Sequence, residues 1–412
     1  MLDIDLKERI NMKILMLSWE YPPKNVGGLS NHVYHLSKNL ARIGHEVHVI
    51  TCQEGTAPIK EKKNGVFVHR IEPYKLQTND FVKWVMQLNF AMIEEAIRLI
   101  REIGKVDIIH AHDWLSAYST KTLKWAYNIP VVCTIHATEY GRNNGIRTEM
   151  QSYISSVEWS IVYESWKTVA CSNYMRDEIS RLFSAPLEKI WVIPNGVEVN
   201  EFQRGFNKEN FKKKYANKDE KIILYVGRHV FEKGIQLLVD AIPDIIKEYK
   251  NTKFIICGMG PMTEELKEKV KKSGLSNKVI FTGYISDNEK KKLYGVADIA
   301  VFPSLYEPFG IVALEAMAAK CPVIVSDIGG FSEIINHKVN GMKFICGSSS
   351  SLKDNILEVL SDSRLADKLR EKGFRSVVEN YSWINIALTT VNMYKSVLDE
   401  VKGTEWENKK VL

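Results

Sequence analysis

The sequence predicts a two-domain α/β protein in which each domain is built on a doubly wound, largely parallel sheet. The 412 residues exceed the roughly 250 to 300 at which a single hydrophobic core stops growing. Short, continuous apolar runs recur between helical patterns in both halves, as expected for strands buried on both faces. A polar, lysine-rich stretch separates the two series of runs.

The first series of apolar runs lies at residues 14–18, 47–51, 66–71, 107–112, 131–136, 168–171 and 191–193. Residues 193–197 read Ile-Pro-Asn-Gly-Val, which is a turn signal, and residues 202–220 are polar. We therefore assign residues 1–197 to an N-terminal domain.

The second series lies at residues 222–227, 254–257, 279–283, 299–303, 323–327 and 342–346. It predicts a C-terminal domain over residues 198–380. Residues 381–412 carry apolar side chains at near-helical spacing, so we expect a helical segment whose apolar face packs back on the N-terminal domain.

Charge and composition exclude several classes of protein. The net charge of +6 comes from 56 basic and 50 acidic residues, a mild excess that suits binding of phosphates or an anionic membrane surface. The lysine-rich patches at 208–221, 267–272 and 290–292 lack interleaved aromatics, so we interpret them as solvated faces and expect no nucleic-acid partner.

The six cysteines stand singly, without the spacing of a metal site, so we expect reduced thiols, no metal and a cytoplasmic protein. No apolar run approaches the roughly 20 residues of a membrane span. The amphipathic segment 81–103 is first interpreted as a core helix, with a membrane-surface face as the alternative.

A glycine pair follows the first predicted strand and precedes a helix that begins near Leu29. Gly27 and Gly28 let the backbone approach a phosphate, and the helix N-terminus offers free N–H donors. A tight strand-to-helix turn explains the same glycines equally well, because the sequence lacks the G-x-G-x-x-G pattern.

Two permanent cations, Arg228 and Lys233, lie in the loop after the first strand of the second half. Such a pair can stabilise the charge of a departing diphosphate without a metal. Surface salt bridging is the alternative.

Two carboxylates, Glu307 and Glu315, are placed so that one lies in a loop and the other about two turns along a helix that starts near Gly310. Each can hold sugar hydroxyls. The amides of Gly310, Ile311 and Val312 lie where a helix N-terminus stabilises a phosphate. The alternative is an ordinary capping carboxylate followed by a solvent-facing glutamate.

Taken together, these segments resemble the family-four retaining glycosyltransferases of the GT-B fold, in which two Rossmann-like domains face each other across a cleft. The resemblance covers residue 13 to about residue 393 and includes the turn at 194–197. Segments 110–114 (His-Ala-His-Asp-Trp) and 134–141 (Thr-Ile-His-Ala-Thr-Glu-Tyr-Gly) resemble bacterial and archaeal glycogen (starch) synthases.

The resemblance implies a role for each matching residue. Arg228 and Lys233 would contact the donor diphosphate, Glu307 the transferred sugar, Glu315 the ribose, and His136 the donor sugar near its reacting carbon. The phosphate path and the nucleoside base would be lined by Gly28, the amides of Gly310, Ile311 and Val312, and Tyr284.

Asp113 would lie near the acceptor or the donor-sugar pocket. Without the resemblance, His136 would be interpreted as a hydrogen-bonded histidine at a strand end. One departure concerns Asn25, because glycogen synthases usually carry a lysine two positions before the first glycine of the pair. Lys24 is adjacent but would point elsewhere, so a different donor, a repositioned Lys24 or a non-glucan acceptor stays open.

The resemblance thus implies a retaining hexosyltransferase that moves glucose from ADP- or UDP-glucose to an α-1,4-glucan, without a cofactor or a metal. Its front-face chemistry would use the departing diphosphate to help deprotonate the acceptor hydroxyl. The alternative is transfer to a lipid or small-molecule acceptor at the membrane surface. A nicotinamide-dependent oxidoreductase or a non-catalytic nucleotide-binding protein is a rival from another class, and the missing G-x-G-x-x-G pattern disfavours the oxidoreductase.

Overall fold

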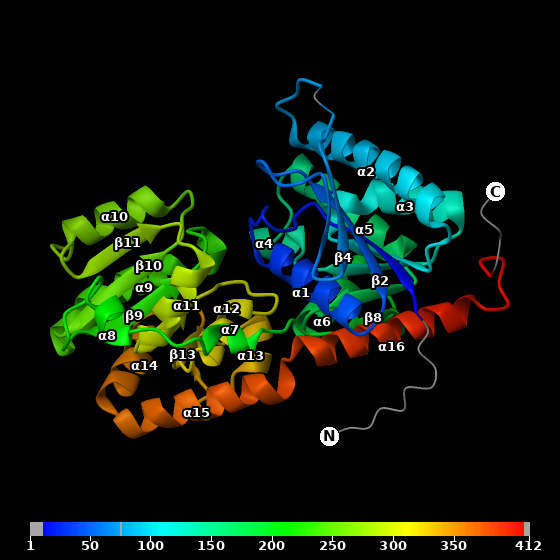
Figure 1. The fold of residues 1–412 in the computed structure, drawn as a ribbon. Helices are drawn as coiled ribbons and strands as arrows, with labels where there is room; N and C mark the ends of the chain where they lie inside the picture. The colour runs from blue at the N-terminus through cyan, green and yellow to red at the C-terminus, as the bar shows by residue number, and fades with distance from the viewer. Residues whose placement is uncertain (1–10, 75, 408–412) are drawn as a thin grey trace. The chain divides into compact units, whose positions relative to one another are not determined.

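The computed structural model describes residues 11–74 and 76–407, which form two compact units (Figure 1). One unit comprises Met1–Pro194 together with Trp383–Leu412, and the other comprises Asn195–Ser382. The chain therefore passes between the units after Pro194 and after Ser382, close to the boundaries expected at 197/198 and 380/381. Each unit is an α/β domain, which confirms the predicted fold class.

The first unit is built on an eight-stranded sheet. Its strand order is β3 (Lys60–Lys63), β4 (Val66–Ile71), β2 (Glu46–Cys52), β1 (Lys13–Leu17), β5 (Ile108–His112), β6 (Val131–Ile135), β7 (Lys167–Ala170) and β8 (Ile190–Val192). All pairings are parallel except that of β3, which lies antiparallel at the edge. The sequence analysis missed β3, because its Lys-Glu-Lys-Lys sequence carries no apolar alternation.

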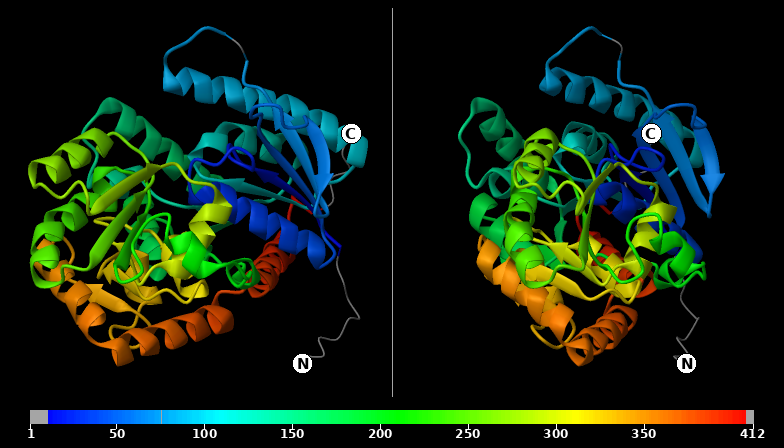
Figure 2. Two further views of the ribbon diagram at one scale, coloured as in Figure 1. Left: turned by 60° about the vertical axis from the view of Figure 1, so that its left-hand side comes forward. Right: turned by 90° about the vertical axis from the view of Figure 1, so that its left-hand side faces the viewer.

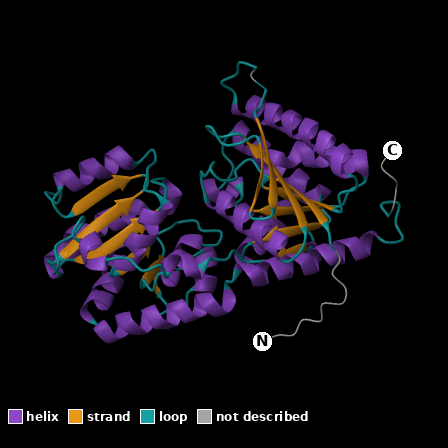
Figure 3. Cartoon of the chain, viewed as in Figure 1, coloured by secondary structure: helices purple, strands orange, loops and turns teal. Residues whose placement is uncertain are grey.

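Helices cover both faces of this sheet (Figure 3). One apolar cluster joins the sheet to α1 (Gly28–Arg42) and α16 (Trp383–Val401). A second cluster joins it to α2 (Phe81–Ile103) and α3 (Ala117–Tyr127). The remaining helices are α4 (Glu139–Asn143), α5 (Glu149–Glu164) and α6 (Asn173–Phe183). Segment 81–103 is therefore a core helix, with Leu88, Met92 and Leu99 buried against the sheet.

The C-terminal helix is part of the core of the first unit. Along α16, Trp383, Met393 and Val397 are buried in the cluster that includes α1 and the strands. The Tyr394 hydroxyl lies 2.6 Å from Nδ1 of His110, whose Nε2 lies 2.7 Å from the Thr134 hydroxyl. These bonds tie α16 to β5 and β6, as expected for the segment beginning at residue 381; its end, 408–412, lies outside the described residues.

The second unit contains a six-stranded, fully parallel sheet. Its strand order is β11 (Val279–Gly283), β10 (Thr252–Cys257), β9 (Lys221–Val226), β12 (Ile299–Phe302), β13 (Val323–Ser326) and β14 (Met342–Phe344). One apolar cluster joins it to α9 (Ile235–Glu248), α10 (Thr263–Lys272), α14 (Ser349–Ser361) and α15 (Ser363–Asn380).

The chain reverses its direction across this sheet after β11, so right-handed crossovers place α11 (Asp287–Val296) and α12 (Ile311–Ala318) on the face opposite α9 and α10 (Figure 2). Short helices α7 (Val199–Phe202), α8 (Lys208–Lys212) and α13 (Gly329–Ile334) complete the unit. No helix in the described parts of the chain is long and apolar enough to cross a membrane.

Each sheet has one place where the strand order reverses. In the first unit it lies between β1 and β5, and in the second between β9 and β12. Neighbouring connections there leave on opposite faces and open a crevice beyond the carboxyl ends of the strands, where open α/β sheets bind ligands. This topology directs attention to the loops that follow these four strands.

The loops after β9 and β12 approach each other so closely that one position requires glycine. Gly234 has a φ of +64°, and a Cβ atom built there would lie 1.8 Å from the carbonyl oxygen of Pro303. The contact holds the residue before it, Lys233, beside the loop that follows β12.

We expect Gly234→Ala to destabilise the second unit far more than Gly274→Ala. Gly274 has a similar φ of +69° but open space around its would-be Cβ atom, so its substitution reports the backbone strain alone, about 1 to 2 kcal/mol. The collision with Pro303 should add at least about 2 kcal/mol. Guanidinium unfolding of both variants measures the difference, and equal losses would contradict the close approach.

Candidate active site

An ion pair between a partly exposed lysine and a buried carboxylate joins the two loops at the reversal point of the second sheet. The Lys233 ammonium lies 2.8 Å from Oε2 of Glu307, and the Ser304 hydroxyl donates to the same oxygen over 3.0 Å. Glu307 is only 7% exposed. Because a buried carboxylate is stable only when it is paired and hydrogen-bonded, these two donors fix its position.

The backbone of Glu307 is held as firmly as its side chain. Its carbonyl oxygen accepts the Gly330 N–H from α13 over 2.9 Å. Ser304 in turn receives a hydrogen bond on its carbonyl oxygen from the Ser326 hydroxyl at the end of β13. The loop after β12 is therefore braced by the next strand and by the helix that follows it.

Arg228 lies in the same crevice but remains open to solvent. Its guanidinium is 3.3 Å from Oε1 of Glu232, and its side chain is 52% exposed. The Tyr225 hydroxyl donates to the Arg228 carbonyl oxygen over 2.9 Å, and the Glu232 carbonyl oxygen accepts the Leu305 N–H over 2.8 Å. Arg228 and Lys233 thus project from a loop whose backbone is anchored at both ends.

Helix α12 starts directly beyond Glu307. Its first residues are Ile311 and Val312, and its N-cap is Gly310. Gly310 has a φ of +110°, and a Cβ atom built there would lie 2.3 Å from the buried Phe331 ring. Among the described residues, no side chain caps this helix end. The helix start agrees with the one expected near Gly310, and its first N–H groups follow directly on the loop that carries Glu307.

Glu315 lies on the buried side of α12 and not in solvent. It is 7% exposed, and its Oε1 is 2.9 Å from the Lys290 ammonium on α11. Burial alone lowers the pKa of Lys290, but Glu315 and Asp287 beside it raise that pKa to about 12. Within residues 11–74 and 76–407, Oε2 of Glu315 has no hydrogen-bond partner. Burial, and then the neighbouring Glu315 carboxylate, raise the pKa of the Tyr294 hydroxyl on α11, so a hydroxyl of the protein already lies beside this carboxylate.

Tyr284 lies apart from these groups. It follows β11 at the edge of the sheet, separated from β9 by β10, and is 76% exposed. The structure therefore brings Arg228, Lys233 and Glu307 together and leaves Tyr284 on the surface.

In the first unit, the glycine-pair loop holds a carboxylate that the sequence analysis did not single out. Oε2 of Glu20 accepts the Val26 N–H over 2.8 Å and the Gly27 N–H over 3.1 Å, and burial raises the pKa of Glu20. Gly28 follows as the first residue of α1. Two amides of this loop therefore bind a carboxylate that belongs to the protein itself.

The lysine beside Asn25 points away from this loop's amides. The Lys24 ammonium pairs with Oε2 of Glu54 at 2.8 Å, while Asn25 is exposed. Lys24 therefore pairs with a carboxylate of a neighbouring loop, in line with the expectation that it points elsewhere.

His136 and Asp113 meet at the carboxyl ends of β6 and β5. The backbone N–H of His136 donates to Oδ1 of Asp113 over 2.7 Å, and Asp113 has a φ of +57°. Burial raises the pKa of Asp113 to about 6, against the opposing effects of Arg142 at 3.9 Å and of the His136 N–H. Burial also lowers the pKa of His136 to about 3, so its imidazole is neutral near pH 7.

Further histidines surround His136. Nδ1 of His112 lies 3.3 Å from Nε2 of His136, and the His32 ring packs edge-on against both rings. Burial holds the pKa of His112 well below its usual range. The three residues offer nitrogen atoms within 4.8 Å of one another, a set that could hold a metal ion. The absence of a metal site stays a prediction. No motif spacing signals this set, because the three histidines come from α1, β5 and the end of β6.

We expect the stability of the wild type relative to Asp113→Asn to fall as pH rises. The pKa of Asp113 is about 6 in the folded chain against an ordinary 3.8, so the folded chain binds this proton more tightly than the unfolded chain does. The stabilisation of the folded state by this proton is therefore complete below pH 4 and is lost as the pH rises through 6. The loss should approach about 3 kcal/mol.

Urea unfolding of both proteins between pH 4 and pH 7.5 tests this expectation. Asp177→Asn, which removes a 63% exposed carboxylate side chain, is the control. A constant difference between the wild type and Asp113→Asn across this range would contradict the raised pKa.

Comparisons with known proteins agree with the arrangement described above. Residues 26–201 match the model for "Glycosyltransferase Family 4", and residues 206–376 match that for "Glycosyl transferases group 1". A protein of Methanocaldococcus jannaschii described as an uncharacterized glycosyltransferase is 40% identical over 394 residues, covering 94% of this chain and 99% of its own.

A glycogen synthase of Mycobacterium tuberculosis is 34% identical over 398 residues, covering 93% of this chain and 94% of its own. Among solved structures, sucrose-phosphate synthase from Thermosynechococcus elongatus superimposes with a TM-score of 0.83 at 24% identity, covering 95% of this chain and 100% of that one. That likeness shows the fold. The identity and coverage of the two sequence relatives also show the family: the chain belongs to the GT-B glycosyltransferases and is a nucleotide-sugar-dependent hexosyltransferase.

Proposed function

We propose that this enzyme is a retaining glucosyltransferase that extends an α-1,4-glucan with glucose from ADP- or UDP-glucose, and that it works in the cytoplasm. The observation that carries the proposal is the Lys233–Glu307 pair at the reversal point of the second sheet, with Arg228 in the same loop. The 34% identity to a glycogen synthase over nearly the whole chain supports the choice of acceptor.

The cations suit a nucleoside diphosphate leaving group. The Arg228 side chain is half exposed and therefore free to turn toward a ligand, while Lys233 is preset by Glu307. Charge-assisted hydrogen bonds from two cations stabilise the negative charge that develops as the glycosidic bond to phosphate breaks. The amides of Gly310, Ile311 and Val312 at the start of α12 would add partial positive charge beside them.

Two carboxylates suit the hydroxyl groups of the donor. Glu307 would accept from the transferred sugar, and the unpartnered Oε2 of Glu315 would accept from the ribose. A ribose hydroxyl would donate to this carboxylate beside the Tyr294 hydroxyl and so complete the hydrogen bonding of a buried acceptor.

A neutral His136 suits a position beside the reacting sugar. An uncharged imidazole can donate from one nitrogen and accept at the other, which a protonated ring cannot do. Asp113 holds its backbone, and His112 lies beside its ring. Asp113 and Gly28 keep the roles that the resemblance implies, near the acceptor or donor sugar and on the phosphate path, and Tyr284 would lie beside the base.

Retention follows from a front-face transfer. The acceptor hydroxyl oxygen bonds to the anomeric carbon on the side from which the diphosphate leaves, and its proton passes to a phosphate oxygen of that leaving group. Both bonds change on one face, so the anomeric configuration is kept. Positioning and electrostatic stabilisation supply the rate enhancement.

A lipid or small-molecule acceptor at a membrane surface is the second candidate. Exposed apolar side chains gather around the start of α2, where Leu76 is 67%, Phe81 45% and Phe90 51% exposed. With a net charge of +6, such a surface would suit an anionic interface.

A nucleotide-release assay tests both candidates. ADP-, UDP- and GDP-glucose are offered with glycogen, maltooligosaccharides or lipid vesicles, and free nucleotide and incorporated sugar are measured. We expect ADP- or UDP-glucose to be consumed with the glucans and the α-linkage to be retained. Turnover with a lipid acceptor and none with glucans would replace the first candidate by the second.

Variants connect the activity to the site. Lys233→Ala and Glu307→Ala should each lower kcat by roughly 100-fold or more, the loss typical of removing one preorganised electrostatic group. Lys353→Ala is the control, because the Lys353 side chain is 23% exposed against 25% for Lys233 and forms a 3.1 Å ion pair away from the crevice with Glu248, whose side chain is 53% exposed. Near-normal turnover in both site variants would refute the assignment.

A further inference from the structure

A cavity lies at the amino ends of the strands of the second sheet, opposite the carboxyl ends where the candidate active site lies. Its volume is about 740 Å³, within the range of small-molecule sites. Asp298, which directly precedes β12, and Lys320, which precedes β13, line it. Glu307, in contrast, follows the carboxyl end of β12. The cavity and the candidate active site are therefore separated by the length of the strands.

The lining of this cavity is strongly basic. Five cationic side chains contribute to it: Arg204, Lys208, Lys212, Lys320 and Arg370. The acidic residues are Glu209 and Asp298, so the lining carries a net charge of +3, from five positive and two negative groups.

Both acidic residues already have partners outside the cavity. Oδ1 of Asp298 pairs with Lys221 at 3.0 Å while Oδ2 accepts the Ile222 N–H, and Glu209 lies 3.9 Å from Lys213. The carboxylates therefore do little to neutralise the cations of the cavity.

Most of the cations lack an acidic partner. Across residues 11–74 and 76–407, no carboxylate forms an ion pair with Arg204, Lys208, Lys212 or Lys320. Arg370 pairs with Asp367 at 3.0 Å, on a side chain that is 73% exposed. Like charges gathered without counterions repel one another, and an anion relieves that repulsion.

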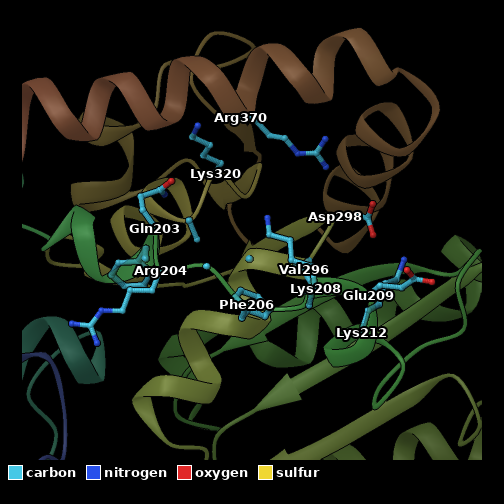
Figure 4. A pocket seen from close by; sticks show the side chains of 15 residues that line it. Gln203, Arg204, Phe206, Lys208, Glu209, Lys212, Val296, Asp298, Lys320 and Arg370 are labelled. Atoms are coloured by element: carbon cyan, nitrogen blue, oxygen red, sulfur yellow. The ribbon is translucent and has the colours of Figure 1, made fainter.

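The side chains come from three separate segments around one hollow (Figure 4). Lys208, on α8, rises into it and the Arg370 guanidinium reaches over it from α15, whereas the Lys320 ammonium points away from both and lies 4.6 Å from the centre of the Phe374 ring. Arg204 turns away from the hollow. Phe206 and Val296 add an apolar wall. This combination suits a dianion attached to a carbon skeleton.

We propose that this cavity binds the phosphate group of a phosphorylated small molecule, with Lys208 and Arg370 as the principal ligands. The sequence analysis interpreted the patch at 208–221 as a solvated face, since Lys320 and Arg370, which convert it into a cavity, are distant in the sequence. The proposal does not depend on which sugar the enzyme transfers.

Calorimetric titration with ribose 5-phosphate, inorganic phosphate and ribose tests the proposal. We expect the two phosphates to bind, ribose not to bind, and the affinity to fall with added salt. The double variant Lys208→Ala/Arg370→Ala should weaken phosphate binding roughly tenfold or more, since charge-assisted hydrogen bonds are lost. If ribose 5-phosphate binds more tightly than inorganic phosphate, the ligand of the cavity is an organic phosphate. If the two bind equally, the ligand is the free phosphate ion.

A matched double variant, Lys272→Ala/Arg375→Ala, removes the same charges outside the cavity lining, from α10 and from the helix that carries Arg370. It should bind like the wild type. Lys233→Ala should also keep its affinity for ribose 5-phosphate, which separates this site from the donor site. Wild-type affinity in the Lys208/Arg370 variant, equal loss in the matched variant, or no phosphate binding in any protein would overturn the proposal.

Discussion

The ion pair between Lys233 and Glu307 depends on the parallel order of the second sheet, and the geometry of the candidate site depends on that pair. The two residues are brought together because β9 and β12 are neighbours whose loops leave at the same edge. A carboxylate that is 7% exposed needs its cation, so the removal of Lys233 leaves a buried charge that is strongly destabilising, whereas the Lys233 side chain is 25% exposed and can be solvated without Glu307. Gly234 makes the approach possible, and Ser304 completes the hydrogen bonding.

The first unit uses burial in a different way. Its histidines at the strand ends are kept neutral because desolvation disfavours the imidazolium form, and Asp113 is kept partly protonated near pH 6 for the same reason. Such groups hydrogen-bond without carrying charge, which suits recognition of sugar hydroxyls. The C-terminal helix contributes to this environment, since Tyr394 fixes the ring of His110 behind that of His112.

The second unit has a different charge pattern at each edge of its sheet. At the carboxyl edge, Lys233 and Glu307 form a compensated pair. At the amino edge, Lys208 and Lys320 have no acidic partner in the described chain, and the acids near them pair elsewhere. A compensated pair preorganises a site for a reaction, whereas uncompensated cations favour binding of an anion.

The sequence alone determined the two parallel sheets, the core helix at 81–103, the start of α12 and the residues of the crevice, because continuous apolar runs, glycine positions and charged loops are local signals. The tertiary structure decided which of these residues meet. Lys233 and Glu307 pair across 74 positions, Glu20 binds the glycine-loop amides, Tyr284 stays on the surface, and Lys208 shares a cavity with Arg370. These contacts depend on strand order and on the path of the chain, and both are set by packing of the whole sheet, which no local pattern encodes.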